Sequence, residues 1–130
     1  MINLIAVDDE SDVKILFDHF FRNEIESGRI GLEFVQSAEA CLKILEENDY
    51  EESSILVLTD INMPHMSGVQ LTEKINESYP LVKVFLISAY DARSQIDNVK
   101  HLNIAEYVSK PVNFGELKDK IFQLFPGDEE

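Results

Sequence analysis

Hydrophobic residues gather in five short runs along the chain, and the stretches between them mix apolar and polar residues. The runs cover residues 3–7, 32–35, 55–59, 82–87 and 104–108. Three of them contain the unbroken apolar segments LIAV, ILVL and VFLI, which is typical of strands covered by helices on both faces. The second run, GLEFV, is more mixed, so we expect its strand to lie nearer an edge of the sheet.

Helical spacing of apolar residues fills the intervals between these runs. In the first interval one apolar stripe at i, i+3, i+4 spacing is formed by Val13, Leu16, Phe17, Phe20 and Ile25. Ser11 precedes the stripe and is the expected N-cap. Further helices are predicted over about 38–47, 69–77, 92–101 and 115–125.

Strand and helix thus alternate five times, which predicts a parallel sheet because parallel strands need long crossover connections. A chain of 130 residues is the usual size of one domain. We therefore expect a single α/β domain over residues 1–126, with 127–130 as an acidic tail or the start of a linker.

Charge and composition narrow the possible partners. With 25 acidic and 11 basic residues the net charge is −14, which argues against binding to nucleic acid or to an anionic membrane. The lone Cys41 lies in a helical segment and is expected to be buried. No apolar run approaches the roughly 18 residues that span a bilayer, and the N-terminus lacks a signal-peptide pattern, so a soluble cytoplasmic protein is expected.

Polar side chains come at or just after the ends of four of the predicted strands. They are Asp8 and Asp9 after the first strand, Asp60 after the third, Ser88 after the fourth and Lys110 after the fifth. Ligands of open α/β sheets bind beyond these carboxyl ends, so we expect the five side chains to converge. Any one of the acids taken alone could equally be a solvated loop residue.

Clustered carboxylates repel one another by about 4 kcal/mol at 4 Å and an effective dielectric near 20, and a hard divalent cation relieves this repulsion. A carboxylate can also attack phosphorus and form an aspartyl phosphate, given a metal, a fixed cation and a hydroxyl donor. Asp60 ends the central buried strand and is the predicted nucleophile. Lys110 and Ser88 are then expected to contact the phosphoryl oxygens.

The motifs VDDE, TDINMPHMSG, Ser88-Ala89 and YVSKP, in this order and at strand ends, resemble the receiver domain of two-component response regulators, as in chemotaxis proteins. The resemblance covers residues 3–125. It implies a flavodoxin-like, doubly wound fold: a five-stranded parallel sheet in the order 2-1-3-4-5 with helices on both faces.

The same resemblance implies roles for individual residues. Asp60 corresponds to the phosphoacceptor. Mg²⁺, with Mn²⁺ as an alternative, would be held by the side chains of Asp9 and Asp60, by the backbone carbonyl of Asn62 and by Asp8 through water. Lys110 corresponds to the family's lysine, and the Lys110-Pro111 bond to its cis peptide.

Three further positions match the family's switch and acceptor-loop residues. Ser88 and Tyr107 correspond to the switch pair, although Tyr107 could also be a core aromatic. Gly68 corresponds to a loop glycine, for which a conformation open to glycine is expected. His65 is expected to be exposed and not to bind the metal, since Mg²⁺ prefers oxygen.

The resemblance implies a phosphorylation-driven switch. A sensor histidine kinase or a histidine phosphotransfer protein would phosphorylate Asp60, and the face formed by residues 92–101, 104–108 and 115–125 would change its affinity for a downstream protein. Asn62 and Tyr90 occupy positions that tune loss of the phosphoryl group, and slow autodephosphorylation is expected. The alternative is a Mg²⁺-dependent phosphatase of the haloacid dehalogenase type. Those enzymes carry a second aspartate two residues after the first, and this chain has Asn62 at that position, which argues against a phosphatase. A flavin-binding flavodoxin relative is disfavoured because Asp8, Asp9 and Glu10 would repel a phosphate.

Overall fold

The computed structural model describes residues 1–89 and 101–126 and contains a five-stranded parallel sheet. The strands are β1 (Ile2–Val7), β2 (Ile30–Val35), β3 (Ile55–Asp60), β4 (Lys83–Ser88) and β5 (Glu106–Ser109). Their spatial order, β2-β1-β3-β4-β5, confirms the predicted topology. All residues of β1 and β3 are buried, whereas β2 is mostly half-buried at its edge, as the mixed run GLEFV indicated.

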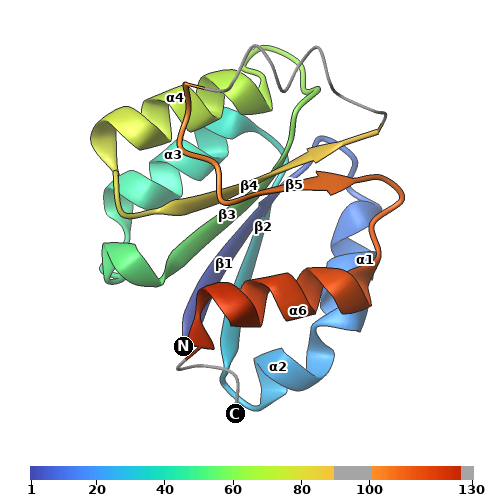
Figure 1. Cartoon of the computed structure of the whole chain (residues 1–130). Helices are drawn as coiled ribbons and strands as arrows, with labels where there is room; N and C mark the ends of the chain where they lie inside the picture. Colours follow the sequence, from blue (N-terminus) through green and yellow to red (C-terminus); the bar gives the residue numbers. More distant parts are fainter. Residues whose placement is uncertain (90–100, 127–130) are drawn as a thin grey trace.

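Helices cover both faces of this sheet (Figure 1). One face carries α1 (Val13–Phe20), α2 (Arg22–Glu26) and α6 (Phe114–Leu124), and the other carries α3 (Ala38–Glu47) and α4 (Gly68–Ser78). A short 3₁₀ helix, η1 (Glu52–Ser54), precedes β3. The predicted helix over 92–101 lies outside the described residues except for His101, and Tyr90 and the expected tail over 127–130 lie outside them as well.

The first helical segment differs from its prediction in two ways. The single stripe is divided between α1 and α2, because the backbone leaves helical geometry at the buried Phe21, where φ is −102° and ψ is 9°. Ser11 is not the N-cap, a position taken by Asp12 without a side-chain hydrogen bond. Backbone carbonyls of residues 10–12 already accept the first amide hydrogens of the helix, which leaves no need for a capping side chain.

Side chains do cap the other long helices. Ser37 accepts a hydrogen bond from the Ala40 amide at the start of α3, which spans the predicted residues 38–47. Ser67 and Gln70 form a reciprocal capping box at α4, and Asn113 caps α6. These caps fix where each of the three helices begins, at the edge where the preceding strand ends.

Two apolar clusters fill the spaces between sheet and helices, one on each face. Cys41 is fully buried in the cluster beneath α3, and burial raises the pKa of its thiol to about 12. Cys41 therefore acts as a small core residue, as expected. None of the helices seen over 1–89 and 101–126 is long and apolar enough to cross a membrane.

Candidate functional site

Three charged side chains meet where the central strands end. Asp60 is the last residue of β3, Asp8 directly follows β1, and both are buried. Lys110 follows β5 and donates a hydrogen bond from Nζ to Asp60 Oδ2 at 2.9 Å. The same Nζ lies 3.6 Å from Asp8 Oδ2. Three of the five side chains predicted to converge at the carboxyl edge of the sheet are therefore in contact there.

Gly68 allows the acceptor loop to fold tightly against Asp60. Its amide donates to the Ile61 carbonyl at 2.9 Å, and a Cβ on Gly68 would clash with the carbonyl oxygen of Asp60. Its φ lies outside the left-handed region, so the expected conformational reason was wrong. Glycine is needed here because the Asp60 carbonyl lies too close to leave room for a side chain. The Asn62 amide completes the loop by donating to Asp60 Oδ1 at 3.1 Å.

Three carboxylates that could bind a metal ion lie together beside Lys110. One carboxylate oxygen each from Asp8, Asp9 and Asp60 lie within 4.8 Å of one another. Asp8 and Asp60 are buried, whereas Asp9 is exposed and faces solvent. An all-oxygen donor set that keeps one side open to water fits Mg²⁺, which prefers carboxylates and retains several waters.

Burial and neighbouring charges set the protonation of this cluster. Burial raises the pKa of Asp8, and the negative charges of Asp60 and Glu10 raise it further. The hydrogen bond from the Glu10 amide and the charge of Lys110 lower it, but the net shift is upward. The Glu10 amide donates to Asp8 Oδ1 at 2.9 Å. Burial lowers the pKa of Lys110, but its hydrogen bond to Asp60 and the surrounding acids outweigh this and leave the pKa raised. Lys110 is therefore a firmly charged ammonium group.

The remaining predicted residues lie around this centre. Ser88 ends β4, is buried, and accepts a hydrogen bond from the Lys110 amide at its carbonyl, at 2.7 Å. Tyr107 lies on β5 opposite Leu86 and packs, half-buried, against the cluster under α3 and α4. His65 is exposed, as expected, with a φ of 68°. The Lys110-Pro111 peptide is cis, also as expected.

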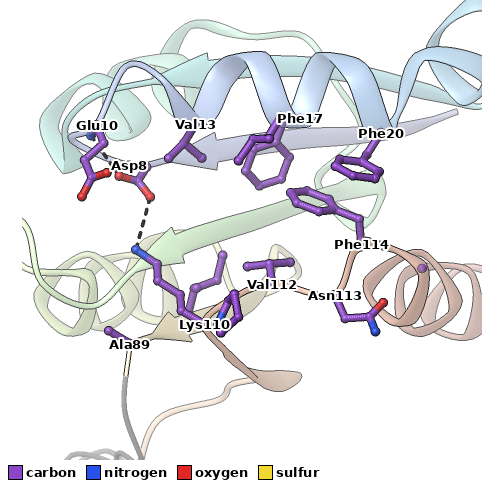
Figure 2. A pocket seen from close by; sticks show the side chains of 14 residues that line it. Asp8, Glu10, Val13, Phe17, Phe20, Ala89, Lys110, Val112, Asn113 and Phe114 are labelled. Carbon is purple, nitrogen blue, oxygen red and sulfur yellow. Dashed lines mark hydrogen bonds and ion pairs between the residues drawn. The ribbon is translucent and has the colours of Figure 1, made fainter.

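Beside Lys110 lies an apolar cavity that the strand-end reasoning missed (Figure 2). Its volume is about 820 Å³, and α1 and the segment after β5 form its walls. Phe17, Phe20, Val112 and Phe114 line it, with Asp8 and Lys110 at one end. The unusually aromatic stripe of the first helix, together with the apolar residues after Pro111, is the sequence signal that could have indicated it.

Comparison with known proteins gives consistent results. Residues 4–122 match the family described as the response regulator receiver domain. The chain is 37% identical over 106 residues to the response regulator protein FleR of Pseudomonas aeruginosa, covering 77% of this chain and 22% of FleR. It is 25% identical over 123 residues to sporulation initiation phosphotransferase F of Bacillus subtilis, covering 95% of this chain and 93% of that protein.

A solved structure agrees with these matches. The response regulator protein TrrA of Thermotoga maritima, crystallised in complex with Mg²⁺–BeF, superimposes with a TM-score of 0.75 at 30% identity. The alignment covers 95% of this chain and 99% of TrrA. Similarity thus extends over the whole domain and not over isolated motifs.

Proposed function

The chain belongs to the response regulator receiver domain family, and we propose that its Asp60 accepts a phosphoryl group from a histidine kinase or a histidine phosphotransfer protein. Members of the family are phosphorylation-dependent signalling switches and generally act as phosphoacceptors rather than enzymes. The family match gives no support to the phosphatase alternative. The observation that carries the assignment to Asp60 is the 2.9 Å contact of its Oδ2 with Lys110, beside Asp8 and Asp9.

In the transfer step, a carboxylate oxygen of Asp60 attacks the phosphorus of the donor's phosphohistidine. A P–O bond forms and the P–N bond breaks, and the departing imidazole nitrogen keeps the electron pair and takes up a proton. Lys110 is already held at the carboxylate and offers its ammonium group to the incoming phosphoryl oxygens. Charge-assisted hydrogen bonds of this kind are stronger than neutral ones.

We assign the metal to the same carboxylates. Bound Mg²⁺, or Mn²⁺ in its place, supplies positive charge that offsets the charge of the phosphoryl group. Asp9 and Asp60 would hold it through their side chains, Asn62 through its carbonyl, and Asp8 through water. The burial of Asp8 and Asp60 beside one another is the feature that favours a cation at this place.

The donor is proposed to dock over α1. Leu16 and Phe20 are large apolar side chains with 47% and 40% of their surface exposed, and they flank the cavity that ends at Asp8 and Lys110. A donor helix with an apolar face could cover these side chains and bring its histidine to Asp60.

The output is proposed to run through Ser88 and Tyr107 to the face formed by β5 and α6; the predicted helix over 92–101, apart from His101, lies outside the described residues. A phosphoryl group on Asp60 would draw the Ser88 hydroxyl and Lys110 toward it, and the half-buried Tyr107 would turn inward. Moving such a switch from about 1:99 to 99:1 requires roughly 5.5 kcal/mol of differential interaction. Tyr90 and Asn62 are proposed to make autodephosphorylation slow, and a phosphoryl half-life of seconds would contradict this.

Labelling with radioactive acetyl phosphate and Mg²⁺ tests the acceptor. The wild type should take up acid-labile phosphate, and Asp60→Asn should take up none. Asp49→Asn, which removes an exposed carboxylate from the loop after α3, is the matched control and should label normally. Persistent labelling of Asp60→Asn would show that another residue is the acceptor.

A further inference from the structure

An aromatic cluster joins α1 to the segment that carries Lys110. The ring of Phe114, the first residue of α6, is stacked on Phe20 with centroids 4.4 Å apart and planes 3° from parallel. The same ring meets Phe17 edge-on at 5.3 Å and Phe21 at 6.2 Å. Figure 2 shows the rings of Phe20 and Phe114 lying against each other, away from the end of the cavity where Asp8 and Lys110 lie.

The short segment from Lys110 to Phe114 is anchored at both ends. At one end the Lys110 amide donates to the Ser88 carbonyl at 2.7 Å. At the other end Phe114 sits in the aromatic cluster, and Asn113 accepts a hydrogen bond from the Glu116 amide. The direction in which Lys110 leaves the backbone therefore depends on where Phe114 is held.

Packing around the lysine side chain cannot replace this anchoring. Lys110 lines the cavity of about 820 Å³, so one side of its aliphatic stem faces open space. Its side chain is 28% exposed, and the ammonium group is held by Asp60 and Asp8 at its tip. A shift of the segment would thus move the ammonium group away from Asp60 without meeting a steric barrier on the cavity side.

We propose that Phe20 and Phe114 are positioning residues for Lys110, whose stacked rings hold the segment 110–114 so that the ammonium group stays on Asp60. The inference rests on the proposed role of Lys110 in phosphoryl transfer and deepens it. Phe20 is 40% exposed, so its ring contributes little to the core compared with Phe17 or Phe21. Burial of apolar surface in the core therefore does not explain why the Phe20 ring stacks on Phe114.

Three variants at exposed positions of α1 test the proposal in the full chain. Phe20→Leu removes the ring but keeps an apolar side chain, and Phe20→Tyr keeps the ring with its hydroxyl able to reach solvent. Ile15→Ala is the matched control, since Ile15 is 69% exposed and makes none of these ring contacts. Acetyl phosphate is the donor, because it needs no docking surface and so separates positioning from partner binding.

Phe20→Leu should lower the saturated labelling rate by about tenfold, the scale expected when a reacting group is displaced by a fraction of an ångström to an ångström. The acetyl phosphate concentration for half-maximal rate should stay unchanged, and Phe20→Tyr should restore the wild-type rate. Ile15→Ala should label normally. Equal rates for Phe20→Leu and the wild type would overturn the proposal.

A double-mutant comparison separates positioning from general destabilisation. In a Lys110→Ala background, Phe20→Leu should have no further effect on the labelling rate. If labelling of the Lys110→Ala variants is below detection, binding of beryllium trifluoride with Mg²⁺, measured by ¹⁹F NMR, is compared between the single and the double variant instead. An equal loss in both backgrounds would mean that Phe20 acts on the fold and not through Lys110. If the wild type itself takes up no phosphate, the proposed function fails, and not merely this inference.

Discussion

Lys110 Nζ and Asp60 Oδ2 lie 2.9 Å apart, although the two residues are separated by 50 positions in the chain. The contact joins the ends of β3 and β5, which are not neighbours in the sheet because β4 lies between them. Lys110 thus reaches across the end of β4 to contact the carboxylate. Its ammonium group occupies part of the space in which a metal and a phosphoryl group would also interact with Asp60.

Competition between Lys110 and a cation should be measurable. Lys110→Met should tighten Mg²⁺ binding by roughly five- to tenfold, because it removes a positive charge within 4 Å of two carboxylates. Isothermal titration calorimetry gives the affinity. Lys43→Met, which removes an exposed charge on α3, should leave it unchanged. Weaker binding in Lys110→Met would mean that the lysine organises the metal site instead of competing with it.

Asp8 should make stability depend on pH in a definite direction when divalent ions are removed by a chelator. Burial raises its pKa in the folded state above the ordinary 3.8. The folded protein therefore binds this proton more tightly than the unfolded chain does. The ionised carboxylate lowers stability above the folded pKa, and this cost disappears as the pH falls through that pKa toward 3.8.

Asp8→Asn should accordingly raise the free energy of unfolding at pH 7 by about 1 kcal/mol, a typical size for a single buried substitution. The gain should shrink as the pH falls toward 4. Denaturant unfolding at several pH values measures both effects, with Asp49→Asn as the exposed control. A loss of stability at pH 7 would show that the ion pair with Lys110 outweighs the burial of the charge.

Gly68→Ala should destabilise the protein by about 1–3 kcal/mol, since the new methyl group would overlap the Asp60 carbonyl oxygen. The same change should slow phosphate uptake, because the backbone of the acceptor must move. Gly115→Ala is the matched control in α6, where the added Cβ would meet only Asn113 Oδ1, at an ordinary contact distance of 3.4 Å. It should stabilise the helix by about 0.5–1 kcal/mol. Thermal unfolding and labelling report the two effects, and a neutral Gly68→Ala would contradict the close approach.

Leu16→Asp should slow phosphoryl transfer from a histidine phosphotransfer protein that labels the wild type, because it places a charge in the proposed docking surface. A loss of about tenfold or more is expected for an interface anchor. Labelling by acetyl phosphate should be unaffected. Ile15→Asp, on another side of α1, should leave both reactions unchanged. If both variants lose transfer equally, docking does not depend on the cavity side of the helix.

The strands, and the edge of the sheet at which the site lies, could be predicted from the sequence because both depend on simple patterns of apolar and polar residues. Continuous apolarity marks a doubly covered strand, and Asp8 and Asp60 follow such runs, whereas Lys110 comes two residues after the mixed fifth run. The break at Phe21 was not predictable, because the residues on either side keep helical spacing. The reason for Gly68 was also missed, since the approach of the Asp60 carbonyl is a contact between segments that only folding brings together.

The aromatic cluster was missed for a similar reason. Phe20 and Phe114 lie in different helices, and nothing in the local pattern around either residue indicates stacking. Phe20 was instead assigned only to the apolar stripe of the first helix. Stacking of the half-exposed Phe20 on the buried Phe114 depends on how two helices are placed and not on the periodicity of either one.

The positions of the capped helix starts affect the electrostatic field at the carboxyl edge of the sheet. Since α3, α4 and α6 each begin at the edge where the preceding strand ends, their amide dipoles direct partial positive charge toward the same edge as the carboxylates. Phosphorylation of Asp60, as proposed, would add about two negative charges to a protein whose net charge is already −14. Partial positive charge from these helix starts would then add to that of Lys110 and of the proposed metal in offsetting the new charge.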